Sequence, residues 1–177
     1  MINYFKMIAN LEQNSSKIEL DAVDLQILGQ LQTNADITNQ QLAVRVYTSP
    51  PTCLRRVKRL KDAGLIERQV AILSTDKLAP LLGHGLTAIV EITLERQDTR
   101  SLEAFEAGMM PDAAVQQCYR VSPGPDFVLI VYAQDMPGYL ALSERLFTAD
   151  GNVRNVKAFF SVKRGKFAPG FPVAAKR

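Results

Sequence analysis

The sequence predicts an α+β protein with two domains, three short helices first and a mixed set of strands and helices after them. This prediction depends on two patterns. Apolar residues recur at helical spacing between residues 20 and 63, whereas later segments alternate apolar and polar residues as half-buried strands do. The 177 residues are 47% hydrophobic and 22% charged, an ordinary composition for a globular protein, and this length allows two small domains.

The scarce residue types exclude several classes of protein. The chain has two cysteines, Cys53 and Cys118, and one histidine, His84, which are too few for a four-ligand zinc site or a disulfide framework. It also has no apolar run of the roughly 18–20 residues that a membrane span needs, and residues 1–16 do not resemble a secretion signal. We therefore expect a cytoplasmic protein with no metal, no cofactor and no membrane partner.

The N-terminal third is expected to begin with two short helices that have recognisable starts. The first covers residues 20–32, where Asp21 is a suitable N-cap and Asp24 favours the positive end of the helix. The second follows Thr38, which forms a capping box with Gln41, so that each side chain accepts a hydrogen bond from the backbone amide of the other.

The third helix is expected to start after Ser49 and to run to about residue 63. Ser49 can cap it, Pro50 suits the first position, where no amide donor is required, and Gly64 ends it in a left-handed conformation. Residues 65–73 follow as an extended segment, which fits a wing. A short helix, a tight turn and a capped helix have the spacing of a helix-turn-helix motif.

Drawn as a helical wheel at about 100° per residue, the third helix has an apolar side and a basic side. With Val57 at its centre, the expected core stripe comprises Cys53, Leu54 and Leu60. The opposite side combines guanidinium groups, which bind guanine edges and phosphates, with short hydroxyls that allow close approach to DNA. The DNA contacts that we expect are Arg45, Ser49, Thr52, Arg55, Arg56, Lys58 and Arg59.

Charge is unevenly distributed along the chain. Residues 45–68 carry seven basic and two acidic side chains, whereas residues 81–153 carry four basic and ten acidic ones. An anionic partner such as double-stranded DNA is therefore plausible for the first stretch and not for the second. A solvated helix face explains the basic run equally well on charge alone, and the helix-turn-helix spacing is what favours DNA.

The C-terminal two thirds of the chain indicate a second domain with the order βαββαβ. The expected strands are residues 86–94, 114–121, 127–133 and 156–162, and the expected helices are residues 100–110 and 137–147. This is the ferredoxin-like order, in which an antiparallel sheet carries both helices on one face. Nothing remains to cover the other face, so we expect two copies of the sheet to pair in a dimer.

The same patterns divide the chain into five parts. These are an N-terminal extension over residues 1–19, a winged helix-turn-helix domain over 20–73, a linker over 74–85, the ferredoxin-like domain over 86–163 and a basic, solvated tail over 164–177. The extension fits either a disordered tail or an additional helix. The linker assignment depends on the helix-breaking residues Pro80, Gly83 and Gly85.

Two motifs in these elements resemble the Lrp/AsnC, or feast/famine, transcription regulators. One is Leu-Asp-x-x-Asp-x-x-Ile-Leu at residues 20–28, and the other is Ser-Pro-x-x-Cys-x-x-Arg-Val at residues 49–57. The resemblance implies a winged helix-turn-helix followed by an α+β ligand-sensing domain, in proteins that dimerise, commonly assemble into octamers and often bind amino acids. One departure is Tyr47, where the family usually has Gly, and a left-handed conformation there costs about 1–2 kcal/mol.

The resemblance also implies an effector site in the turn between the second and third strands of the C-terminal domain. The family typically has Gly-x-x-Asp in this turn, and here the candidates are Ser122, Gly124 and Asp126. A glycine-bearing loop offers backbone amides to a carboxylate, and Asp126 offers a partner to the α-ammonium group of an amino acid. Pro123 and Pro125 remove two amide donors, and a rigid hairpin turn with no ligand explains the segment equally well.

Three functions compete at this point. The leading one is a sequence-specific transcription regulator that binds DNA as an oligomer and responds to an amino acid or a related metabolite. The second is an enzyme resembling the sirohaem decarboxylases, but those enzymes rely on histidines and this chain has one. The third is a ligand-binding or assembly module without DNA binding, and Arg55, Arg56 and Arg59 argue against it. We therefore expect no enzymatic activity.

Overall fold

The computed structural model describes residues 19–83 and 85–173, which form two compact units. The first unit contains the described residues up to 72 together with residues 168–173, and the second contains residues 73–167. The N-terminal extension expected over residues 1–19 lies outside the described residues apart from Glu19. Within the described part of the chain, no helix is both long and apolar enough to cross a membrane.

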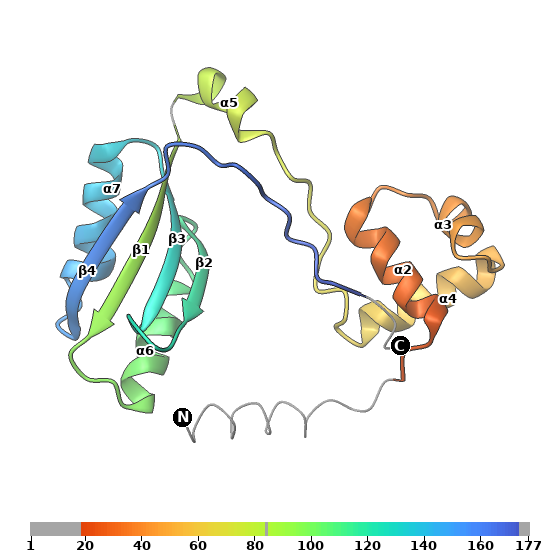
Figure 1. Cartoon of the computed structure of the whole chain (residues 1–177), viewed down its shortest axis with the longest axis horizontal. Coiled ribbons are helices and arrows are strands. Elements are labelled where there is room, and N and C mark those ends of the chain that lie inside the picture. The colour runs from red at the N-terminus through yellow and green to blue at the C-terminus, as the bar shows by residue number, and fades with distance from the viewer. Residues whose placement is uncertain (1–18, 84, 174–177) are drawn as a thin grey trace. The chain divides into compact units, whose positions relative to one another are not determined.

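The first unit contains the three helices that the sequence predicts, α2 (Ala22–Thr33), α3 (Asn39–Arg45) and α4 (Pro50–Asp62) (Figure 1). Both expected N-caps, Asp21 and Thr38, are present. The Asp21 cap is a reciprocal pair with Asp24, which we expected only to favour the positive end of the helix. The backbone N–H of Asp24 donates to Asp21 Oδ1 at 2.9 Å, and the N–H of Asp21 donates back to Asp24 Oδ2 at 3.1 Å. Thr38 and Gln41 make the same reciprocal pair at the start of α3, at 3.2 and 3.1 Å. Local hydrogen bonding thus determines where these two helices begin.

The core of the first unit corrects one sequence prediction. Its fully buried apolar residues are Ile27, Leu42, Ala43, Val46, Cys53 and Leu60. Leu54, which we expected in this core, is 60% exposed, whereas Val57 is half-buried. On the wheel, Cys53 and Leu60 lie about 50° to one side of Val57 and Leu54 lies about 60° to the other. The buried side is therefore centred between Cys53 and Leu60, and Leu54 points away from it.

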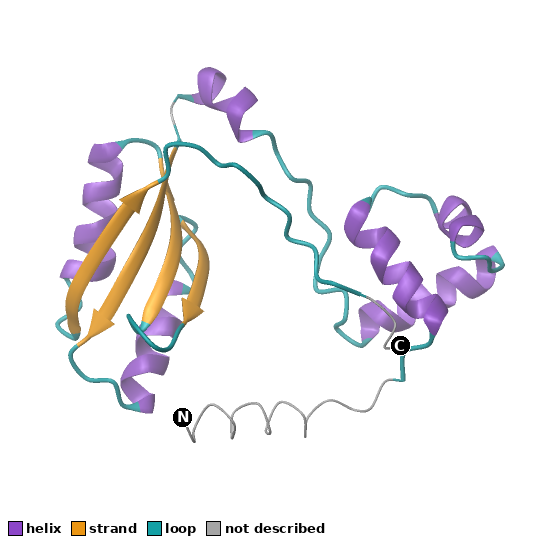
Figure 2. Ribbon diagram, viewed as in Figure 1, coloured by secondary structure: helices purple, strands orange, loops and turns teal. Residues whose placement is uncertain are grey.

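The segment between α4 and the first strand of the second unit differs from expectation in one element. Residues 65–74 form no strand and run as an extended loop (Figure 2), as the sequence pattern indicates. The expected linker, however, contains a short helix, α5 (Thr75–Leu82). Pro80 lies in the last turn of α5, so it interrupts little of the helix, and the helix ends before Gly83, whose φ is 89°. The proline and glycine therefore end a helix here rather than prevent one.

The second unit has the predicted βαββαβ order. Its elements are β1 (Leu86–Leu94), α6 (Thr99–Met109), β2 (Val115–Arg120), β3 (Phe127–Ala133), α7 (Met136–Ser143), the π-helical turn η1 (Glu144–Thr148) and β4 (Val153–Phe160). The sheet order is β2-β3-β1-β4, and every neighbouring pair is antiparallel. Figure 1 shows α6 and α7 on the same face of this sheet.

The helix-covered face of the sheet forms the core of the second unit. Ala88, Val90, Ile92 and Leu94 of β1 and Phe127, Leu129, Val131 and Ala133 of β3 are buried against Phe105, Met109, Tyr139, Leu142 and Phe147. Along α7, Tyr139 and Leu142 are buried, whereas Leu140 is 60% exposed. One strand boundary corrects the sequence prediction, because Val162, expected in the last strand, lies beyond the end of β4.

The opposite face of the sheet carries exposed apolar side chains. Ile89, Tyr119, Tyr132 and Phe159 are exposed there, on all four strands. Ile89 lies beside Phe159 on one neighbouring strand and Ile130 on the other, so these side chains form one continuous surface. No described helix covers this face in Figure 2.

Candidate nucleic-acid interface

The side of α4 opposite the core presents two exposed cations. Arg55 and Lys58 each lie about 150° from the midpoint between Cys53 and Leu60 on the helical wheel, so they point most directly away from the packed side. Both are exposed, and neither forms an ion pair with any described residue. These two side chains are therefore available to bind an external anion.

Two other arginines of α4 are held by acidic residues of α2 and its cap. Arg56 Nη1 lies 2.7 Å from Asp21 Oδ2 and 2.9 Å from Asp24 Oδ1, and Arg59 Nη2 pairs with Asp24 Oδ2. The Asp24 side chain is 1% exposed, so its charge requires these partners. From the sequence we expected Arg56 and Arg59 to contact DNA and considered Asp24 only as a helix-end residue. Asp24 lies three residues before the buried Ile27, and this helical spacing was the available signal that Asp24 faces inward.

The same contacts set the charge state of the Asp21 carboxyl. The pKa of Asp21 lies below its ordinary value, first because the backbone N–H of Asp24 donates to it and then because the Arg56 guanidinium does so. Asp21 therefore holds a negative charge beside the basic helix, where it orients Arg56.

A small hollow lies among these groups. Asp21, Arg55, Arg56 and Arg59 line a space of about 150 Å³. Arg56 Nε is buried and has no hydrogen-bond partner within the described residues. Guanidinium groups that converge in this way offer several N–H donors to one anionic oxygen, which is the chemistry of a phosphate contact.

The remaining predicted DNA contacts lie at the ends of α3 and α4. Arg45 Nη1 donates to Gln30 Oε1 at 3.0 Å, which holds Arg45 against α2. Ser49 precedes α4 as expected, but its side chain does not cap the helix and its hydroxyl donates instead to Thr52 Oγ1 at 2.8 Å. Pro50 and Pro51 follow Ser49 and have no N–H, so fewer amides need a cap there.

The three candidate effector residues lie together in the turn between β2 and β3. Asp126 Oδ2 accepts hydrogen bonds from the Leu94 backbone N–H at 2.7 Å and from Gln97 Nε2 at 3.1 Å. Ser122 and Gly124 are exposed, and Gly124 has a φ of 125°, which favours glycine. Asp126 therefore ties this turn to the end of β1, a role that sequence analysis missed because Leu94 is distant in the chain.

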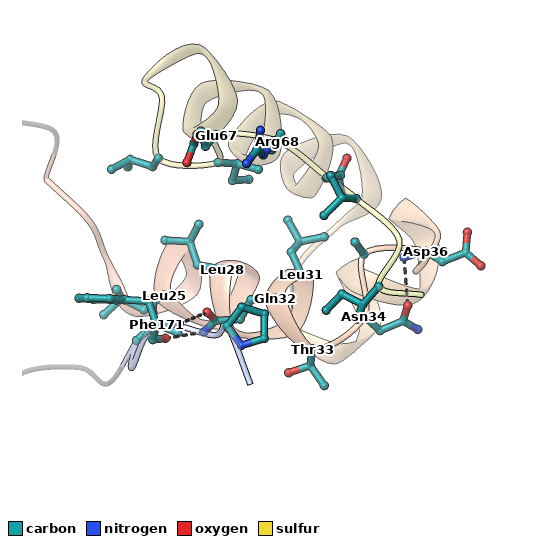
Figure 3. A pocket seen from close by; sticks show the side chains of 18 of the residues that line it. Leu25, Leu28, Leu31, Gln32, Thr33, Asn34, Asp36, Glu67, Arg68 and Phe171 are labelled. Carbon is teal, nitrogen blue, oxygen red and sulfur yellow. Dashed lines mark hydrogen bonds between the residues drawn. The ribbon is translucent and has the colours of Figure 1, made fainter. Parts of the chain in front are cut away.

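A cavity of about 850 Å³ lies beside α2 in the first unit (Figure 3). Leu25, Leu28 and Leu31 of α2 form one wall, and residues 65–72 and 169–173 contribute the others. It is mainly apolar, and its residues belong to a different unit from the candidate effector turn.

One part of the expected solvated tail contacts α2 at this cavity, although its described residues other than Val173 are exposed. The Gln32 side chain pairs with the backbone of Phe171, donating to its carbonyl oxygen and accepting from its N–H, both at 2.7 Å (Figure 3). The tail includes a proline-rich, apolar stretch over residues 169–173, separate from the lysines and arginines on either side of it. Phe171 remains 76% exposed and Val173 is half-buried, so the two hydrogen bonds to Gln32, rather than apolar burial, hold this stretch to α2.

Comparison with known families gives two matches that together cover most of the chain. Residues 20–67 match a winged helix-turn-helix DNA-binding family, and residues 87–170 match the Lrp/AsnC ligand binding domain. The first match contains α2, α3 and α4, and the second contains all of the sheet except Leu86.

Individual relatives agree with these matches over nearly their full lengths. A leucine-responsive regulatory protein of Rhizobium meliloti is 36% identical over 152 residues, covering 86% of this chain and 95% of the relative. One of the same name from Haemophilus influenzae is 40% identical, covering 77% and 80%. The solved structure of a Neisseria meningitidis transcriptional regulator in complex with L-Met is 30% identical with a TM-score of 0.76, covering 88% of this chain and 97% of that one. This chain belongs to the Lrp/AsnC family of DNA-binding transcriptional regulators.

Proposed function

We propose that this regulator binds double-stranded DNA with the outward side of α4, and that Arg55 and Lys58 are its principal contacts. The observation that carries this proposal is their position, exposed and directed away from the buried pair Cys53 and Leu60. Ser49 and Thr52 add short hydroxyls at the start of the same helix, whereas Arg45, Arg56 and Arg59 support the interface while bound to side chains of the first unit.

The test compares single substitutions at these cations. Arg55→Ala is expected to weaken binding to a duplex that the wild-type protein selects from a random pool by about 5- to 150-fold, as loss of a base contact does. Lys58→Ala is expected to weaken binding to all duplexes alike. It is also expected to reduce the slope of log affinity against log salt concentration by the equivalent of about one phosphate contact. Fluorescence anisotropy at several salt concentrations measures both effects.

Lys77→Ala is the matched control for these variants, because Lys77 is an exposed cation on α5 in the second unit. It removes the same charge and is expected to leave DNA binding unchanged. If the Arg55→Ala, Lys58→Ala double variant binds as tightly as the wild-type protein, the proposed interface is wrong.

We further propose that the second unit dimerises through its open sheet face, assembles further toward an octamer and binds an amino acid near Ser122, Gly124 and Asp126 at a contact between dimers. The Neisseria relative, whose structure contains L-Met, supports this class of ligand. Asp126 Oδ1 accepts no hydrogen bond from the described residues, so it is available to an ammonium group. The ligand must bind one assembly state more tightly than another, since otherwise it cannot change DNA affinity.

Calorimetry with a panel of L-amino acids that includes L-methionine tests the effector proposal. Asp126→Ala is expected to weaken the binding of the recognised amino acid at least tenfold. Gln97→Ala is the control, because it removes one partner of the Asp126 carboxylate and leaves the charge in place. Equal binding by wild type and Asp126→Ala shows that the carboxylate is not the ammonium partner, and no binding at millimolar concentration indicates an assembly domain without a sensor role.

Family membership also supports the coarser features of the proposal. The relatives are named as regulators, and we propose that this protein likewise acts by binding and has no catalytic activity. Because its DNA target and its metabolite effector both occur there, we place it in the cytoplasm.

A further inference from the structure

The turn between α3 and α4 contains a tyrosine in a conformation that favours glycine. After α3, the N–H of Thr48 donates to the carbonyl of Ala43 at 2.9 Å, and the N–H of Tyr47 donates to the carbonyl of Val44 at 3.3 Å. This is the Schellman pattern of helix ends, and its first residue outside the helix is left-handed. That residue is Tyr47, with a φ of 53°.

The end of α4 provides an internal comparison. The N–H of Leu65 donates to the carbonyl of Leu60 at 3.0 Å, and the N–H of Gly64 donates to the carbonyl of Lys61 at 2.9 Å, which is the same pattern. Here the left-handed residue is Gly64, with a φ of 71°. Glycine has no Cβ and adopts this conformation without steric strain, whereas tyrosine does not. The chain therefore uses the same helix end twice and has the unfavourable residue at only one of them.

Contacts within the described chain do not compensate for the strain at Tyr47. Its side chain is 92% exposed, and among the described residues its hydroxyl has no hydrogen-bond partner and its ring has no aromatic or cationic neighbour. Exposed ring surface adds nothing to stability in the free protein. Strained backbone that persists without a local benefit is typical of functional positions.

The location of Tyr47 indicates which partner its side chain contacts. It lies two residues before Ser49, in the turn that leads into α4, and in a helix-turn-helix protein the start of this second helix points toward the DNA. A phenol hydroxyl is a hydrogen-bond donor that suits a phosphate oxygen. We propose that Tyr47 contacts the DNA backbone beside the groove that α4 enters; this inference rests on the proposed DNA interface.

The test measures stability and DNA affinity in the same variants. Tyr47→Gly is expected to raise the melting temperature, because the strain is removed, and to weaken DNA binding about three- to tenfold, because the contact is lost. The loss is expected on both the selected duplex and a random-sequence duplex, since a phosphate contact carries no sequence information. Tyr47→Phe keeps the ring and is expected to lose affinity without gaining stability.

Met110→Ala is the control for loss of a large exposed side chain, because Met110 is 73% exposed in the second unit and lies outside the open sheet face. It is expected to leave the affinity for both duplexes unchanged. If Tyr47→Gly binds both duplexes as the wild-type protein does, or if it lowers the melting temperature, the inference is wrong. If its mass by light scattering falls instead, the ring contacts a second copy and the inference is also wrong. Failure of the wild-type protein to bind any duplex overturns the proposed function, and this inference with it.

Discussion

At the scale of single residues, Asp24 shows how a buried charge organises the helix-turn-helix unit. It is almost fully buried, its carboxylate receives two guanidinium groups from α4, and it also accepts the backbone N–H of Asp21. A buried carboxylate without such partners is costly, so the pairing with Arg56 and Arg59 holds α2 in register with α4. Arg59 therefore has a structural partner, whereas Arg55, one turn earlier in α4, has no ion-pair partner among the described residues.

This difference predicts opposite behaviour for two arginines of one helix. Arg59→Ala is expected to lower the free energy of unfolding by about 1–2 kcal/mol, because Asp24 loses one of its partners while Arg59 is itself half exposed. Arg55→Ala is expected to change it by less than about 0.5 kcal/mol, as surface substitutions usually do. Urea denaturation followed by circular dichroism measures both values, and equal stability of the two variants contradicts the role given to Asp24.

At the scale of elements, an ion pair joins the loop before β2 to the π-helical turn η1. The Asp112 carboxylate pairs with Arg145 Nη1, and Asp112 Oδ1 accepts a hydrogen bond from the backbone N–H of Ala114 at 2.9 Å. These bonds lower the pKa of Asp112 below its ordinary value of 3.8, the Arg145 hydrogen bond having the largest effect. The carboxylate form is therefore the one that the folded protein favours.

The lowered pKa predicts how stability depends on pH. Because the pKa of Asp112 is lower in the folded state, its stabilising contribution is present above pH 3.8 and is lost as the pH falls through the folded value. Asp112→Asn is thus expected to be less stable than the wild-type protein at pH 7, and the difference is expected to narrow below pH 3.8. Urea denaturation from pH 3 to pH 7 measures this trend.

Glu103→Gln is the control for that experiment, because Glu103 is an exposed carboxylate on α6 that forms no ion pair with the described residues. It is expected to show only a small difference from the wild-type protein across the range. A stability difference for Asp112→Asn that stays constant down to pH 3 argues against the ion pair as its source.

At the scale of the whole molecule, each unit has its own hydrophobic core. In the second unit the described helices leave one face of the sheet uncovered, the open sheet face with Ile89, Tyr119, Tyr132 and Phe159. An apolar sheet face of this kind is a typical interface between identical subunits, because the same surface on a second copy can cover it.

The open face predicts the effect of a charge at its centre. Ile89→Lys places a cation on the central strand β1 and is expected to reduce the molar mass to that of a single chain, because a charge buried between two sheets is unfavourable. Light scattering measures the mass, and circular dichroism checks that the sheet remains folded. Val162→Lys, beyond the end of β4, is expected to keep the mass of the wild-type protein. An Ile89→Lys variant of unchanged mass contradicts sheet pairing.

Apart from α5, which lies in the expected linker, the elements of both units were predictable from the sequence because their causes are local. Capping pairs such as Thr38 with Gln41, the helix stop at Gly64 and the alternation in β1 and β3 each depend on residues within a few positions of one another. The strained turn at Tyr47 was also recognisable, since it departs from a family pattern at one position. The family followed from the same motifs.

The tertiary structure decided which residues far apart in the chain contact one another. Only packing against α2 could show that Arg56 and Arg59 are held by acidic side chains while Arg55 and Lys58 remain exposed, and that the buried side of α4 excludes Leu54. The same holds for Asp126, which binds the end of β1, and for Phe171, which binds Gln32. Helical periodicity determines which residues share a side, but the neighbouring element determines which side is buried, and that element is specified elsewhere in the sequence.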